Sequence, residues 1–188
     1  MQVVANWDER WRQREGDLEP DPWLVAVAAL FPAVGDCLDV ACGRGRNALW
    51  LAGQGWRVTG IDKSPVGLEI AAREAAQKGL SLTLRQQDLE RSPRLPVDCC
   101  DLLLQFFYLQ RALYPALLAA VRPGGVAVVR TFSLAGPFAA GGLARQFVLN
   151  PGELPEVFAG WEILRHEEGL EASRKGGSLA GIVARKPA

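Results

Sequence analysis

A short apolar run followed by two glycines is the feature that most restricts how this chain can fold. Residues 38–40 have the composition of a buried strand, and Gly43 and Gly45 follow within a few positions. Glycine lacks a Cβ atom, so it adopts positive φ readily and lets another group approach the backbone. A helix beginning at Arg46 would present free N–H groups and a partial positive charge to this turn. The pattern therefore predicts a strand–turn–helix unit whose turn binds a ligand.

Two acids accompany this turn. Asp39 lies in the first predicted strand, and Asp62 closes the second, at residues 57–61. A carboxylate at the second position can accept hydrogen bonds from both hydroxyls of a ribose. Residues 43–48 also fit the dinucleotide fingerprint G-x-G-x-x-A, with Asp62 about 20 residues further on. The turn alone therefore leaves NAD and S-adenosylmethionine (SAM) open. Asp39 favours SAM, because SAM carries an ammonium group and a sulfonium, whereas a pyrophosphate gains nothing from a carboxylate there.

The remainder of the chain alternates between predicted strands and helices. Two helices are expected within residues 6–31, with Asn6 and Asp21 as N-caps and Pro22 at a first helical position. The other expected helices are 46–53, 65–78, 112–121 and 153–159, and the expected strands are 37–40, 57–61, 81–85, 101–106, 126–131, 161–166 and 178–184. Such alternation predicts an α/β, doubly wound, mostly parallel sheet, in which the last two strands pair as a hairpin.

The organisation predicted is a single domain over residues 1–188. Residues 1–35 are expected to supply lid helices, and the Gly- and Ala-rich segment 133–150 is expected to be a loop over the active-site face. A chain of 188 residues suits one domain with a sizeable core.

Composition excludes several functions. The chain has 21 basic and 21 acidic residues, so it lacks the basic footprint of a nucleic-acid-binding protein. The chain has no run of about 18 apolar residues, so we expect no membrane-spanning helix. The first residues lack the pattern of a signal peptide. We therefore expect a cytoplasmic protein. Four cysteines without a C-x-x-C pair, and a single histidine, predict no metal site.

The turn resembles a known family motif. Residues 39–47, Asp-Val-Ala-Cys-Gly-Arg-Gly-Arg-Asn, are similar to the first motif of the class I SAM-dependent methyltransferases. Gly-Arg-Asn-Ala at 45–48 resembles the TehB-type, tellurite-resistance subgroup of small-molecule methyltransferases. The resemblance runs from about Trp7 to Arg185, and it includes the Pro-Gly-Gly turn at 123–125. It implies a Rossmann-like sheet of seven strands, the last of them antiparallel to the rest.

The resemblance also implies which residues bind SAM. They are Trp11, Asp39, Ala41, Gly43, Gly45, Asn47, Asp62, Lys63, Asp88, Leu89 and Gln105. Asp88 would accept a hydrogen bond from the adenine amino group, unless it is a solvated loop acid. Trp11 would cover SAM from the first helix, unless it and Trp7 only dock that helix onto the core.

On the acceptor side, the candidate catalytic residues are Tyr108 and Arg111. Tyr108 would orient the acceptor, and Arg111 would face it or else lie in solvent. Phe106 and Phe107 would floor the pocket beside the sulfonium or pack under a helix. The chain offers few bases, and His166 has no evident acidic partner. A soft or already anionic acceptor needs no general base, so we expect a thiol, a selenium or tellurium oxyanion, or a halide.

Two other functions remain open from the sequence. An NAD(P)-binding oxidoreductase would fit the glycine pattern, although no Tyr-x-x-x-Lys pair for hydride transfer is evident. A SAM-binding protein without catalysis would fit the poor supply of bases. In each case we expect a small-molecule ligand, neither nucleic acid nor membrane as a partner, and a monomer or homodimer.

Overall fold

The computed structural model describes residues 6–14, 16, 18–137, 144–172 and 177–188. A sheet of seven strands runs in the order β3-β2-β1-β4-β5-β7-β6. The strands are β1 (Asp36–Val40), β2 (Arg57–Asp62), β3 (Leu82–Gln86), β4 (Cys100–Phe106), β5 (Val121–Ser133), β6 (Glu162–Ala172) and β7 (Ser178–Arg185). β7 is antiparallel to both of its neighbours, and the other pairs are parallel. The predicted fold class and the antiparallel last strand are confirmed.

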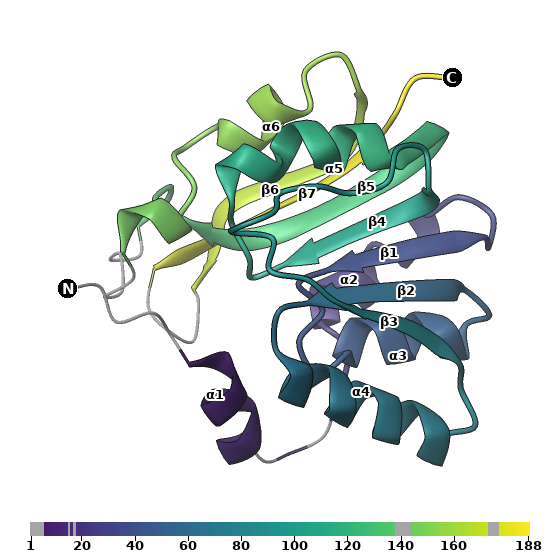
Figure 1. The fold of residues 1–188 in the computed structure, drawn as a ribbon. Helices are drawn as coiled ribbons and strands as arrows, with labels where there is room; N and C mark the ends of the chain where they lie inside the picture. The colour runs from purple at the N-terminus through teal and green to yellow at the C-terminus, as the bar shows by residue number, and fades with distance from the viewer. Residues whose placement is uncertain (1–5, 15, 17, 138–143, 173–176) are drawn as a thin grey trace.

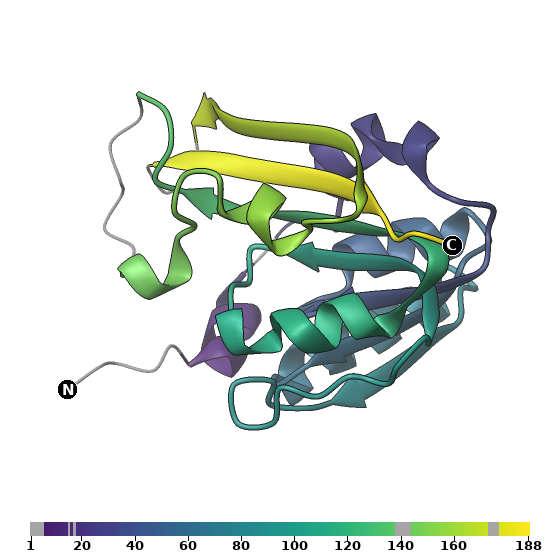
Figure 2. The same ribbon diagram turned by 90° about the horizontal axis from the view of Figure 1, so that it is seen from above.

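Helices cover both faces of this sheet (Figure 1). They are α1 (Trp7–Gln13), α2 (Pro22–Ala26), α3 (Arg46–Gly53), α4 (Pro65–Gln77), α5 (Tyr114–Ala120) and α6 (Glu153–Val157), with 3-10 turns η1 (Ala28–Leu30), η2 (Arg111–Leu113) and η3 (Arg145–Phe147). α5 and α6 lie on one face, and α3 and α4 lie on the other. Figure 2 shows β4 and β5 pointing toward the end of the sheet where α1 lies.

The central strand β4 is buried on both faces. Leu103 packs into the cluster formed with α5 and α6, whereas Leu102 and Leu104 pack into the cluster formed with α2 and α3. All three side chains are fully buried. This is the expected environment of a near-continuous apolar strand in a parallel sheet with helices on both sides.

The helix starts follow the predicted capping residues. Asn6 Oδ1 accepts a hydrogen bond from Glu9 N at 3.2 Å, and Asp21 Oδ1 accepts one from Trp23 N at 3.1 Å. Ser64 Oγ accepts from Gly67 N at 3.1 Å, directly before Pro65. Each contact satisfies one of the free N–H groups of a first helical turn.

Several element bounds differ from the predicted ones. β5 begins at Val121 instead of 126, because Val121 pairs with Cys100 on the far side of a register shift. β6 continues to Ala172, across a second irregularity in the hairpin with β7. In the segment predicted as a loop, residues 133–150, Leu149 pairs with the end of β5 and η3 forms a single turn. Residues 138–143 of that segment lie outside the described residues.

Candidate cofactor and acceptor site

The turn after β1 needs glycine at two positions. Gly43 and Gly45 have φ of 57° and 76°, in the left-handed region. A Cβ atom on Gly43 would lie 2.8 Å from Cζ2 of Trp11, and one on Gly45 would lie 2.8 Å from Cβ of Ala71. The glycines therefore let α1 and α4 pack directly against the turn.

Asp62 fixes the conformation of this turn. Its Oδ2 accepts a hydrogen bond from Gly43 N and its Oδ1 accepts one from Ser64 N, both at 2.8 Å. Burial raises the pKa of the carboxyl, and these two N–H groups oppose the rise. Each carboxylate oxygen can accept a further bond, so the geometry is compatible with the predicted ribose contact, which stays a prediction.

Asp39 is a buried carboxylate with an unsatisfied oxygen. Its Oδ2 has no hydrogen-bond partner among the residues that the structure describes, and only 2% of the residue surface is exposed. Burial, followed by the charge of Asp62, raises the pKa of Asp39 to about 7, while Arg46 and the Ala48 N–H act in the opposite direction. An unpaired buried carboxylate is costly. The position therefore suits a cationic ligand group.

Four of the predicted site residues carry a buried polar atom that has no hydrogen-bond partner in the described part of the protein. These atoms are Trp11 Nε1, Asp39 Oδ2, Gln105 Oε1 and Tyr108 Oη. Among the described residues the same condition holds for Arg44 Nε, Thr131 Oγ1 and Ser178 Oγ. Buried polar groups normally have a partner. Donors and acceptors left open at the carboxyl ends of β1 and β4 are typical of a site that binds a polar ligand.

A cleft of about 410 Å³ opens between α1 and the carboxyl ends of β2 and β3. Its volume falls within the range of small-molecule sites, roughly 300–1,000 Å³. The lining residues are Asn6, Trp7, Asp8, Lys63, Ser64, Gln86, Gln87 and Asp88. Two predicted cofactor residues, Lys63 and Asp88, thus lie at the strand ends where open α/β sheets bind ligands.

The loop after β3 is held by its own hydrogen bonds. Asp88 Oδ1 accepts from Glu90 N at 3.0 Å and from Arg91 N at 3.3 Å. Lys63 Nζ pairs with Glu90 Oε2 at 3.1 Å, which joins this loop to the end of β2. Leu89 is buried in the cluster under α5. Asp88 is therefore an ordered side chain on the cleft wall.

Helix α1 covers the turn. The Trp11 ring lies against Gly43 and Gly67, and it stacks on Trp7 with ring centres 5.5 Å apart. Asp8 accepts a hydrogen bond from the hydroxyl of Ser64 at the start of α4. Asp8 and Ser64 were not among the predicted site residues, and the only sequence signal for Ser64 is its helix cap. Trp11 contacts both the first turn of α4 and the glycine turn, and its role toward SAM stays a prediction.

Two other predicted cofactor residues have local structural contacts. Asn47 Oδ1 accepts from Asp21 N at 2.9 Å, so this side chain ties the start of α2 to α3. Ala41 has φ of 57°, an uncommon conformation for a residue other than glycine, directly after β1. Gln105 donates from Nε2 to the carbonyl oxygen of Tyr108 at 3.1 Å and shapes the bend after β4.

The Tyr108 hydroxyl has no hydrogen-bond partner within the described part of the chain. Burial and the negative charges of Glu90, Asp88 and Asp62 raise its pKa above the ordinary value. The hydroxyl therefore stays protonated at neutral pH. It can donate a hydrogen bond, but it is a poor general base.

Arg111 is engaged by other protein groups. Its Nε and Nη2 donate to the two carboxylate oxygens of Glu153 at 2.8 and 2.7 Å. Nη1 and Nη2 also donate to the carbonyl oxygens of Gln146 and Val148. The guanidinium thus holds the segment before α6 against the end of β4. Glu153, which the sequence did not single out, completes this clamp.

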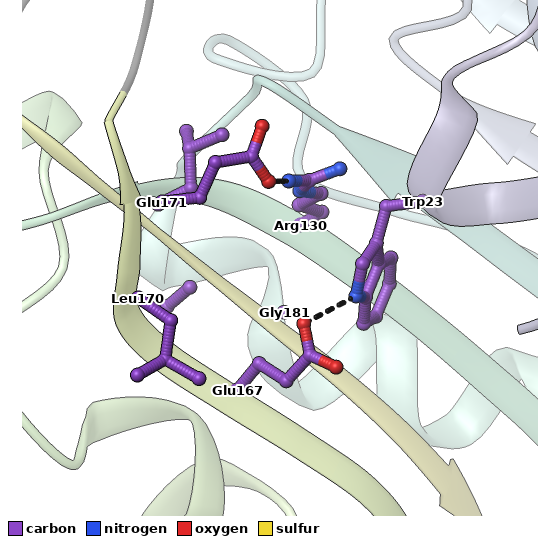
Figure 3. A pocket seen from close by; sticks show the side chains of 8 residues that line it. Trp23, Arg130, Glu167, Leu170, Glu171 and Gly181 are labelled. Atoms are coloured by element: carbon purple, nitrogen blue, oxygen red, sulfur yellow. Dashed lines mark hydrogen bonds and ion pairs between the residues drawn. The ribbon is translucent and has the colours of Figure 1, made fainter. Parts of the chain in front are cut away.

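A second cluster of charges lies beside β5, where Figure 3 shows Trp23, Arg130, Glu167 and Glu171. Trp23 Nε1 donates to Glu167 at 2.9 Å, and Arg130 pairs with Glu171 and with Asp21. The space among these residues is about 10 Å³, about enough for one water. These groups satisfy one another, and they anchor α2 to the sheet.

Within the described residues, no group of three or more His, Cys, Asp or Glu side chains could hold a metal ion. In the same part of the chain, no helix has the length and apolarity needed to cross a membrane.

Comparisons with known proteins agree with the fold of the chain. Residues 37–125 match a family model described as a methyltransferase domain. Hemagglutinin 1 of Eikenella corrodens is 27% identical over 152 residues, which are 77% of this chain and 50% of that protein. A ubiquinone biosynthesis O-methyltransferase of Nitrosococcus oceani is 28% identical over 127 residues, 62% of this chain and 54% of that protein. The chain therefore spans about half the length of these curated relatives.

One curated relative is matched over most of its length. The thiopurine S-methyltransferase of Pseudomonas putida is 29% identical over 205 aligned positions, covering 89% of this chain and 86% of that protein.

Solved structures share the fold. TehB from Haemophilus influenzae superposes with a TM-score of 0.79 at 18% identity, covering 96% of this chain and 67% of that one. A second solved structure is that of a protein described with the conversion of a disulfide bond into a thioacetal group during echinomycin biosynthesis. It superposes with a TM-score of 0.73 at 26% identity, covering 96% of this chain and 92% of that one. The matched model identifies residues 37–125 as a methyltransferase domain, and the chain shares its fold with solved SAM-dependent methyltransferases.

Proposed function

We propose that this chain binds SAM and transfers its methyl group to a small acceptor whose reacting atom is soft or anionic. The observation that supports the proposal best is the unpartnered Oδ2 of buried Asp39, beside the Gly43–Gly45 turn. A cationic group relieves the cost of that carboxylate, and SAM carries two cationic groups. A pyrophosphate at the same place would raise the cost, which disfavours NAD(P).

The remaining cofactor roles follow from position. Asp62 would accept the ribose hydroxyls while it holds the turn, and Asp88 would accept from the adenine amino group at the cleft wall. Trp11 would cover the site, and its free Nε1–H could donate to an oxygen of the ligand. Ala41, Asn47, Lys63, Leu89 and Gln105 would shape the walls.

In the reaction, SAM supplies the methyl group on a sulfonium. The chain positions the acceptor and keeps water away, which accounts for much of the rate in such a displacement. Tyr108 would donate a hydrogen bond that orients the acceptor, because its raised pKa keeps it protonated. Arg111 would act on the acceptor pocket through the segment it holds.

Neither candidate catalytic residue is suited to remove a proton from the acceptor: Tyr108 stays protonated, and Arg111 is a cation paired with Glu153. This supports an acceptor that is already anionic or very nucleophilic, such as a thiolate. The thiopurine S-methyltransferase relative has a sulfur acceptor by name. An oxygen acceptor is the second candidate, favoured by the O-methyltransferase relative.

Calorimetry with SAM and S-adenosylhomocysteine tests the first step. We expect micromolar binding of both, and no comparable heat with NADH. The proposal is contradicted if the folded protein binds neither SAM nor S-adenosylhomocysteine at millimolar concentration. Transfer of label from SAM to a panel of thiols, phenols and oxyanions then separates an enzyme from a protein that only binds SAM.

A further inference from the structure

An aromatic ring is exposed directly after β4. Phe107 keeps 36% of its surface accessible, although the ring of Phe132 lies 5.5 Å away and that of Phe106 lies 6.4 Å away. Its φ is 56°, and its N–H donates to the carbonyl oxygen of Arg130 at 2.8 Å. Bulky residues rarely adopt this conformation, so the backbone is strained at this position. Backbone strain of this kind clusters at functional sites.

A cation accompanies this ring. Cζ of Arg46 lies 5.6 Å from the centre of the Phe107 ring. Arg46 directly follows Gly45, so it joins the aromatic ring to the cofactor turn, and its charge opposes the rise in the pKa of Asp39. Among the described residues its guanidinium forms one hydrogen bond, from Nη2 to Asp21 Oδ2 at 2.8 Å, and a third of the side chain is exposed.

Resting on the proposed methyl transfer, we propose that the acceptor is a planar aromatic molecule bearing an anionic sulfur or oxygen, with its ring against Phe107 and its anionic atom toward Arg46. Aromatic rings bind one another in offset or edge-on contacts. A guanidinium favours a neighbouring anion. An inorganic oxyanion would use the charge of Arg46, but it would leave the solvent-exposed part of the Phe107 ring uncovered.

The charges of the reaction fit this acceptor. The anionic atom forms a bond to the methyl carbon while the carbon–sulfur bond of the sulfonium breaks, and its electron pair stays on the cofactor sulfur. The acceptor loses its negative charge and the cofactor sulfur loses its positive charge, and no proton moves. The chain therefore needs no base at this position, in agreement with the protonated state of Tyr108.

The test measures binding and turnover separately with two thiols. Calorimetry in the presence of S-adenosylhomocysteine gives the Kd of thiophenol and of 2-mercaptoethanol for the wild type and for Phe107→Leu. We expect the variant to bind thiophenol about fivefold more weakly, on the scale of an aromatic pair, with the Kd of 2-mercaptoethanol changed less than twofold. Phe107→Tyr keeps the ring and should restore the affinity for thiophenol. Labelled SAM should show the same difference in KM.

A matched control lies at the other end of the sheet. Phe31 precedes β1 and packs edge-on against Trp56, so Phe31→Leu should change neither thiol's affinity. The aromatic acceptor would be overturned if Phe107→Leu lost affinity equally for both thiols. It would also be overturned if the variant bound thiophenol as tightly as the wild type. Wild-type protein that binds S-adenosylhomocysteine but shows no preference for thiophenol contradicts this inference alone. Failure to bind SAM or S-adenosylhomocysteine contradicts the proposed function itself.

Discussion

At the scale of single residues, the site is organised by acids that the backbone only partly satisfies. Asp62 uses both carboxylate oxygens on backbone N–H groups, whereas Asp39 leaves one oxygen open. The two acids are close enough for the charge of Asp62 to raise the pKa of Asp39. One acid thus builds the turn, and the other has an open oxygen, which we propose faces a cationic group of the ligand.

Replacing Asp62 should weaken SAM binding. Asp62→Ala removes charged hydrogen bonds to the turn and to the ribose, so we expect a loss of about 1.5–3 kcal/mol in binding free energy. Asp62→Asn keeps one acceptor oxygen and should lose less. Calorimetry with SAM measures both, and thermal melting confirms that the variants are folded. An unchanged Kd in Asp62→Ala would show that the ribose contact is misassigned.

Tyr108 should affect turnover more than cofactor binding. Tyr108→Phe removes the unpartnered hydroxyl and keeps the ring, so we expect kcat to fall about tenfold or more while the Kd for SAM changes less than twofold. Loss of SAM affinity with kcat unchanged would place the hydroxyl on the cofactor instead of the acceptor.

At the scale of elements, the sequence patterns predict the strands and helices. They do not predict where each element ends, nor which distant side chains pair to hold the elements together. The alternation of apolar runs and capped helices predicted every strand of the sheet. Val121–Gly125 was predicted to end a helix and form a turn, yet β5 includes it because of a pairing with Cys100. The partner of Arg111 was likewise not predictable from the sequence, because Glu153 lies 42 positions away in the chain and is brought beside it by the fold.

The Arg111–Glu153 clamp should be separable from cofactor binding. Arg111→Met breaks the paired hydrogen bonds and frees the carbonyl oxygens of Gln146 and Val148, so we expect unfolding to become easier by about 1–3 kcal/mol. The KM of the acceptor should rise while the Kd of SAM stays within twofold. Glu153→Gln should give a similar, non-additive loss in a double-mutant cycle measured by urea unfolding. Full additivity would contradict the clamp.

At the scale of the whole molecule, Asp39 makes stability depend on pH. Its pKa rises from 3.8 to about 7 on folding. Between these pH values the folded state binds more protons than the unfolded state, so the free energy of unfolding falls as pH rises.

At 1.36 kcal/mol per pKa unit the total effect is at most about 4 kcal/mol. Urea unfolding without ligand at pH 5 and pH 8 should show the decrease in the wild type. Asp39→Asn should show a smaller decrease, with a remainder from Asp62, whose pKa burial also raises. Identical slopes for the two proteins would rule out a raised pKa at Asp39.

Cofactor binding should show the opposite dependence. An ammonium group pairs with ionised Asp39, so with a pKa of about 7 the affinity for SAM should increase about 25-fold from pH 5.5 to pH 7.5, as the competent fraction grows. Asp39→Asn should bind more weakly and lose most of this dependence. Calorimetry across this pH range measures the Kd of SAM. A Kd that does not change with pH in the wild type would show that Asp39 does not contact the ammonium group.

The sequence by itself determined the fold class, the glycine turn and the acids at three strand ends, because these depend on local composition and on spacing along one chain. The tertiary structure decided which groups are already satisfied. It showed Asn47 bonded to Asp21, Arg111 bonded to Glu153, and Asp39 left with an open oxygen. It also placed Phe107 beside Arg46. These outcomes depend on contacts between residues far apart in the chain, and on burial, which sets the free energy of a charge and is not a property of any single segment.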